Sequence, residues 1–164
     1  MQLDLKDIFD AQIILDRSIH VKHDVLYNQV LDELKLALTV ELAELANATR
    51  VFKFWSLKSP ESRTDILEEY VDGVHFITSL SIIFKAKSKF TLLDDISILD
   101  KKNTTKYFNE LFNMISLLKD ATSIERWYQK YLILGYHLGF SFNDIYEAYF
   151  KKNQINFKRQ QENY

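Results

Sequence analysis

Apolar side chains recur about every 3.6 residues along almost the whole chain, which is typical of helices that bury one face. The pattern predicts a first helix around residues 5–19 and a second from a cap at Asp24 to about Phe52. Ser59 and Pro60 then predict the start of a third helix, because Ser is a preferred N-cap and Pro suits the first helical position.

The periodicity weakens after Lys85, and residues 86–103 are expected to form a solvated loop. Gly139 is well placed to stop a helix, and Asp144 would lie in the first turn of the helix that follows it. Three further helices are therefore expected, at about 104–119, at about 122–138, and from a cap at Ser141 onward.

Composition supports an all-α fold. The 164 residues include 3 Gly and 1 Pro, too few for the many tight turns of a β-sandwich or barrel. We expect one domain over residues 1–164, a bundle of five or six helices. The absence of Cys rules out disulfides and thiolate metal sites. No apolar stretch reaches the roughly 20 residues of a membrane span, so a cytoplasmic protein is expected without a membrane partner. The net charge of −2 does not favour nucleic-acid binding.

Four acidic residues interrupt the apolar faces of the second and third expected helices. Glu41 and Glu44 lie three residues apart, as do Glu69 and Asp72, and residues at i and i+3 share a helix face. Carboxylates are rarely buried unless they are paired or bind a metal. A connection of moderate length favours antiparallel packing of the two helices, which would bring the four carboxylates together.

Such a group would repel itself strongly unless a hard divalent cation bound there. Mg²⁺ prefers oxygen ligands and is often completed by substrate phosphates. The pattern therefore predicts metal-assisted attack of water on a phosphoanhydride. Asp72 and His75 also resemble half of a di-iron motif, but that site needs a second copy, which the sequence lacks. His75 is instead expected near the metal ligands or in the core.

Three longer strings make the sequence similar to the dimeric, all-α dUTP diphosphatases, which are related to MazG-type nucleotide pyrophosphohydrolases. They are 41–56 (ELAELANATRVFKFWS), 66–76 (ILEEYVDGVHF) and 149–164 (YFKKNQINFKRQQENY). The residues from Gln12 to Asp16 resemble the first motif of the family. Asp16 stands where that family often has Asn, and Asn163 where it usually has Gly.

The resemblance implies Mg²⁺-dependent hydrolysis of dUTP, and also of dUDP, to dUMP by a homodimer. It implies that Glu41, Glu44, Glu69 and Asp72 hold the metal. It also implies that Glu41 orients the attacking water as general base.

The same resemblance indicates residues that contact the nucleotide. Gln12 offers the donor and the acceptor that a uracil edge requires, and Trp55 could pack on the base. Cations and amides suit the phosphates and the sugar. The remaining candidates are Lys53, Lys152, Asn153, Asn156, Arg159 and Tyr164.

Two alternatives remain open. A related house-cleaning pyrophosphohydrolase acting on dCTP or non-standard nucleotides would share the metal site. A non-enzymatic helical interaction or regulatory protein would not need Glu41.

Overall fold

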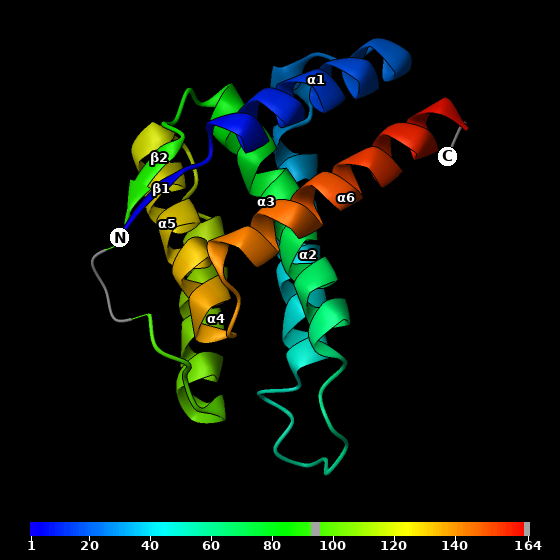
Figure 1. Ribbon diagram of the computed structural model, residues 1–164. Helices are drawn as coiled ribbons and strands as arrows, with labels where there is room; N and C mark the ends of the chain where they lie inside the picture. The colour runs from blue at the N-terminus through cyan, green and yellow to red at the C-terminus, as the bar shows by residue number, and fades with distance from the viewer. Residues whose placement is uncertain (93–95, 163–164) are drawn as a thin grey trace.

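The computed structural model describes residues 1–92 and 96–162, and within these ranges it contains six α-helices and one small sheet (Figure 1). The prediction of an all-α fold is thereby confirmed. The elements in chain order are β1 (Gln2–Asp4), α1 (Lys6–His23), the 3₁₀ turn η1 (Tyr27–Gln29), α2 (Leu31–Thr49), α3 (Arg63–Ile83), β2 (Lys89–Thr91), α4 (Lys101–Ile115), α5 (Ala121–His137) and α6 (Phe142–Gln161).

Helix α3 is the centre of the fold, since it contacts α1, α2, α5 and α6. It runs antiparallel to α2, as expected, and the two are joined by a long connection at one end of the pair (Figure 1). Helices α1 and α6 lie side by side across the other half of α3, whereas α4 packs on α5 and α2. Helices α1, α2 and α6 therefore enclose one face of α3, and that face carries the candidate site residues of this helix.

A reciprocal pair of tyrosines fixes α3 against α5. The hydroxyl of Tyr70 donates to the carbonyl of Tyr131 at 2.9 Å, and the hydroxyl of Tyr131 donates to the carbonyl of Tyr70 at 2.9 Å. Their rings stack with centroids 4.6 Å apart, and both side chains are fully buried. A Cβ on Gly73 would lie 2.8 Å from Cζ of Tyr131, so the close approach requires glycine there. This reciprocal tyrosine pair, the clasp, sets the position of the segment of α3 around residues 69–73.

Two predicted helix starts are wrong. Helix α3 begins at Arg63 and not at Pro60, because Ser62 is its N-cap and accepts a hydrogen bond from the backbone N–H of Asp65. The backbone N–H of Glu61 donates to the carbonyl of Ala48 at 3.0 Å, which fastens the preceding residues to the end of α2.

Helix α2 begins at Leu31, after η1. Asp24 does not cap it. That residue ends α1 in a left-handed conformation with φ 52°, and its backbone N–H donates to the carbonyl of His20.

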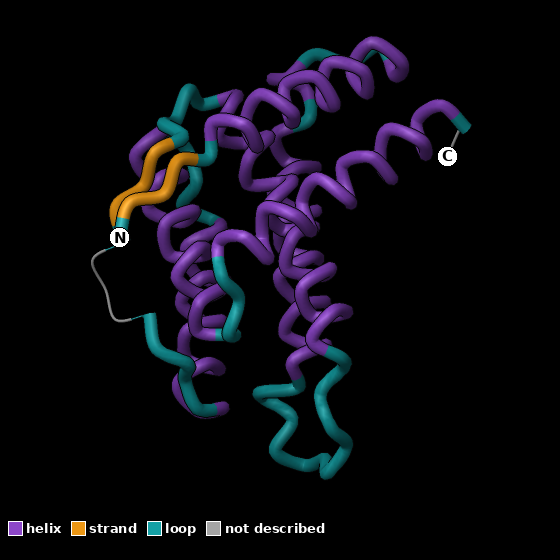
Figure 2. Tube along the Cα trace, viewed as in Figure 1, coloured by secondary structure: helices purple, strands orange, loops and turns teal. Residues whose placement is uncertain are grey.

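The predicted loop over 86–103 contains a strand that local periodicity did not reveal. β2 pairs antiparallel with β1 at the N-terminus, with Leu3 opposite Phe90, and both side chains are buried (Figure 2). Strand partners almost 90 residues apart leave no periodic signal in three-residue segments. The same region also supplies the first residues of α4, which begins at Lys101.

The expected end of α5 and start of α6 are confirmed. Gly139 adopts a φ of +86° and its backbone N–H donates to Tyr136. The Ser141 hydroxyl then accepts a hydrogen bond from the backbone N–H of Asp144. In return, the Asp144 carboxylate accepts a hydrogen bond from the backbone N–H of Ser141. Among the described residues, no helix is both long and apolar enough to traverse a lipid bilayer.

Candidate metal and nucleotide site

Three of the four predicted acids meet between α2 and α3. Glu41 from α2 and Glu69 and Asp72 from α3 each offer a carboxylate oxygen, and these oxygens lie within 4.8 Å of one another. All three side chains are half-buried. Their helix positions explain this placement, because Leu38, Leu42 and Leu45 of α2 are fully buried and turn the same side of that helix inward.

The electrostatics of this cluster fit a cation. Burial is the main cause that raises the pKa of the Glu41 carboxyl to about 7 from its ordinary value of 4.5. Repulsion from Asp72, Glu44 and Glu69 adds to the shift. Burial likewise raises the pKa of Glu69 and of Asp72. The three carboxyl groups are difficult to ionise together because their negative charges repel one another. A hard divalent cation would bind to their oxygens and neutralise these charges.

Glu44 lies at the edge of this cluster. Its side chain is exposed and it does not belong to the group of three whose oxygens converge. It is nevertheless close enough for its charge to raise the pKa of both Glu41 and Glu69.

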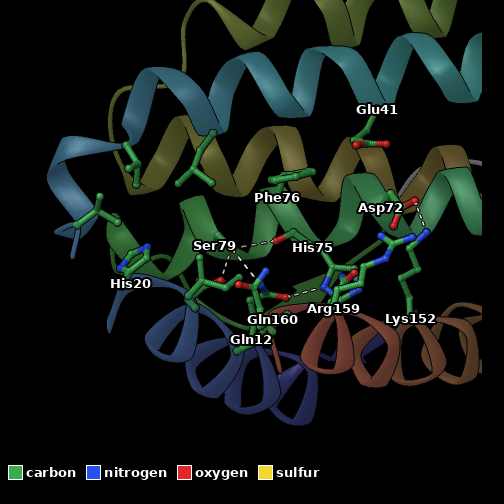
Figure 3. Close-up of a pocket in the computed structure, with 17 residues that line it drawn as sticks. Gln12, His20, Glu41, Asp72, His75, Phe76, Ser79, Lys152, Arg159 and Gln160 are labelled. Carbon is green, nitrogen blue, oxygen red and sulfur yellow. Dashed lines mark hydrogen bonds and ion pairs between the residues drawn. The ribbon is translucent and has the colours of Figure 1, made fainter. Parts of the chain in front are cut away.

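Helix α6 supplies positive charge opposite the acids. The ammonium of Lys152 donates to Oδ2 of Asp72 at 2.7 Å and to Oε1 of Glu68 at 3.0 Å. The charge of Arg159 also acts on Asp72 and offsets a small part of the rise in its pKa that burial causes. Both cations reach from α6 toward the acidic residue on α3 (Figure 3).

A cavity of about 360 Å³ extends from this charged region toward α1. Glu41, Asp72, Lys152, Asn156 and Arg159 line it at the charged end. Its middle is walled by apolar side chains, with the Phe76 ring between α2 and α3 (Figure 3). The volume falls in the range of small-molecule sites. Gln12, Asp16, His75 and Ser79 also contribute polar side chains to the lining, where α1 faces α3 (Figure 3).

The structure distributes the remaining predicted contacts unevenly. Asn153 is buried in α6 and is not part of this lining. Lys53 and Trp55 do not line the cavity of this single chain. They belong to the connection between α2 and α3, which lies at the end of that pair away from α1 (Figure 1). The Trp55 side chain is 64% exposed. Tyr164 and Asn163 lie outside the described residues.

Sequence reasoning missed Phe76, Ser79 and Asp16 as lining residues. Two of them had a visible signal, since Phe76 and Ser79 follow Asp72 at four and seven residues and so continue its helix face. His75 was expected near the metal ligands or in the core. It is buried, and its Nδ1 lies 2.8 Å from Oε1 of Gln12.

One of two comparisons with known proteins gives a match. A comparison with curated proteins found no match. A family model described as dUTPase matches residues 4–164, which is nearly the whole chain and includes the acids of α2 and α3 and the cations of α6. The chain therefore belongs to the all-α dUTPase family, whose activity is the hydrolysis of dUTP.

Proposed function

We propose that this protein is a Mg²⁺-dependent dUTP diphosphatase that releases dUMP and diphosphate from dUTP and also accepts dUDP. The observation that carries the proposal is that Glu41 and Asp72, two of the three converging carboxylates, line one cavity together with Lys152 and Arg159. Such a site suits a triphosphate, because cations and a bound metal together neutralise phosphate oxygens. We place the enzyme in the cytoplasm, where a Cys-free chain needs no oxidising environment.

Glu41, Glu69 and Asp72 would hold the metal, with Glu44 completing the set from the edge. A divalent cation there would polarise phosphate oxygens and lower the pKa of a bound water. Glu41 orients the attacking water and accepts its proton as general base.

Lys152, Asn156 and Arg159 bind the phosphates and the sugar from α6. Phe76 presents an aromatic surface to the base in the middle of the cavity, the role that the sequence had suggested for Trp55. Tyr164 is proposed to contact the substrate from the C-terminus.

The enzyme is also proposed to be a homodimer. Large apolar side chains are exposed on α2 and the connection after it, an unfavourable arrangement for an isolated subunit. They are Leu36, Val40, Phe52, Phe54, Trp55 and Leu57. A second copy covering this surface would carry Lys53 and Trp55 toward the partner's nucleotide. Light scattering should give twice the subunit mass, and Val40→Asp should shift it to that of a monomer; a monomeric wild type would contradict this part.

Diphosphate release from dUTP, dCTP and dTTP, each with and without Mg²⁺, tests the activity. We expect release from dUTP only with the metal, at a rate at least about tenfold above the other two. Glu41→Gln should lower kcat by at least about a hundredfold. Glu33→Gln, an exposed carboxylate on the first turn of α2, is the matched control. A preference for dCTP would favour the related house-cleaning pyrophosphohydrolase. No diphosphate release from any of the three nucleotides would favour the non-enzymatic interaction protein.

A further inference from the structure

The Lys152 side chain borders two cavities. One is the candidate site cavity of about 360 Å³, and the other is a smaller cavity of about 100 Å³ between α3 and α6. The lining of the smaller cavity includes Leu67, Glu68 and Val71 from α3 and Ala148, Lys152 and Ile155 from α6. Lys152 lines both cavities, whereas Asp72 lines the larger one and Glu68 the smaller one. The ammonium therefore has a carboxylate partner on each side.

The two partners of the ammonium differ in their surroundings. Nζ of Lys152 donates to Oδ2 of Asp72 at 2.7 Å and to Oε1 of Glu68 at 3.0 Å. Asp72 is half-buried and belongs to the group of three converging acids, whereas Glu68 is exposed and stands outside that group. The two acids are four residues apart and so share a face of α3. One lysine thus bridges a candidate metal ligand and an acid that is not one.

A metal at the acidic group would separate the roles of these two acids. A divalent cation on Asp72 repels an ammonium that is bound to the same carboxylate. Lys152 is itself buried, and a buried ammonium without a counter-ion is costly. Glu68 lies beyond the converging oxygens, so its carboxylate remains available to the ammonium when Asp72 is occupied.

We propose that Glu68 is a positioning residue of the nucleotide site, which holds the Lys152 ammonium in place while a metal occupies Asp72. The proposal rests on the proposed function, in which Lys152 binds phosphates. The smaller cavity beside Glu68 gives the lysine side chain space to turn away from Asp72. Once the substrate is bound, its phosphates hold the ammonium themselves. Glu68 therefore acts on substrate binding and not on the chemical step.

A double-mutant cycle on dUTP hydrolysis tests the proposal. Glu68→Gln should raise KM for dUTP about three- to fivefold, the size expected for the loss of a partly exposed ion pair, and should leave kcat within about twofold. In a Lys152→Met background the ammonium is absent, and Glu68→Gln should then change KM by less than about 1.5-fold. Glu147→Gln, which alters an exposed carboxylate on α6, is the control and should leave KM unchanged in both backgrounds.

NMR of the lysine ammonium groups, in protein labelled with ¹⁵N-lysine, gives a measurement that needs no turnover. Ammonium protons held in ion pairs exchange slowly with water, and Lys152→Met identifies the signal of this lysine. Without metal, the Lys152 signal should be present in both the wild type and Glu68→Gln, since Asp72 holds the ammonium in each. With saturating Mg²⁺, the signal should persist in the wild type and disappear in Glu68→Gln.

Several outcomes would overturn the proposal. One is a Lys152 signal that Mg²⁺ removes from the wild type, and another is a signal that survives Mg²⁺ in Glu68→Gln. An equal rise in KM with and without Lys152 would show that Glu68 acts by its charge alone, and a loss confined to kcat would place its effect in the chemical step. A wild type that keeps its Lys152 signal with Mg²⁺ but does not hydrolyse dUTP would instead contradict the proposed function.

Discussion

Lys152→Met should destabilise the protein mainly when no metal is present. The Lys152 ammonium donates to Asp72 at 2.7 Å and to Glu68 at 3.0 Å. The side chain of Lys152 is 10% exposed and that of Asp72 is 19% exposed, whereas Glu68 is 55% exposed. The ammonium thus neutralises the acidic cluster from within the protein, and methionine would keep the apolar stem but remove that charge.

The magnitude follows from the burial of each pair. Removing one partner of a fully buried pair costs about 3–5 kcal/mol, and an exposed pair contributes about 0.2–1 kcal/mol. The pair with Asp72 lies between these limits and the pair with Glu68 near the lower one, so we expect a loss of about 2–3 kcal/mol. For a chain of this length that corresponds to a Tm lower by about 4–12 °C.

Thermal unfolding in EDTA and in excess Mg²⁺ measures the effect. In the variant, bound Mg²⁺ neutralises Asp72 in place of the missing ammonium. The loss of folding stability caused by Lys152→Met should therefore shrink to about 1 kcal/mol or less when Mg²⁺ is present. The rise in Tm on adding Mg²⁺ should therefore be larger in the variant than in the wild type. Lys151→Met, the exposed neighbour, should change neither value. An equal loss of stability with and without Mg²⁺ would refute the reasoning.

Three further predictions concern the supports of the site. Gly73→Ala should lower the free energy of unfolding by about 1–3 kcal/mol in urea titrations, because the added methyl group meets the Tyr131 ring; helix propensity alone predicts a gain of up to about 1 kcal/mol, so a stabilised variant would contradict the clasp. The folded-state pKa of Asp16, about 6 against an ordinary 3.8, means that the folded protein holds a proton between those pH values that the unfolded chain has lost. Its ionisation therefore lowers stability as pH rises from about 4 to 6, by up to about 3 kcal/mol, and the cost persists above pH 6. Asp16→Asn should consequently gain stability relative to wild type in denaturant titrations at pH 7.5 compared with pH 4.5; a constant difference would show that the carboxyl titrates normally. Because the pKa of Glu41 is about 7, metal binding at pH 6.5 should release a proton, which calorimetry in buffers of different ionisation enthalpy detects, and apparent Mg²⁺ affinity should rise from pH 6 to 8. Glu41→Gln should abolish that proton release.

Helix boundaries were predictable where the signals were local and unopposed. Gly139 and Ser141 act within a few residues of their own positions, and the structure has them as the sequence indicated. Pro60 failed as a start signal because Ser62 provides a competing cap. Asp24 failed as a start signal because it adopts a left-handed conformation and ends α1.

The chemical character of the site was also readable from the sequence. Carboxylates three residues apart within an apolar stripe identified the face of α2 and α3 that turns inward. That spacing could not separate Glu41 from Glu44, because which of two neighbours points inward depends on how far the helix is rotated about its axis. Packing against α3 sets this rotation, and the structure leaves Glu44 exposed.

The sequence by itself determined that the chain is helical, that acids occupy the inward face of α2 and α3, and that cations gather near the C-terminus. These properties depend on residues within one or two turns of each other. Only the tertiary structure decided that Lys152 pairs with Asp72, 80 residues away, and that Gln12 of α1 donates to Ser79 of α3. Such contacts depend on the relative placement of helices α1, α3 and α6, which is the joint result of packing over the whole core and leaves no periodic trace in any one segment.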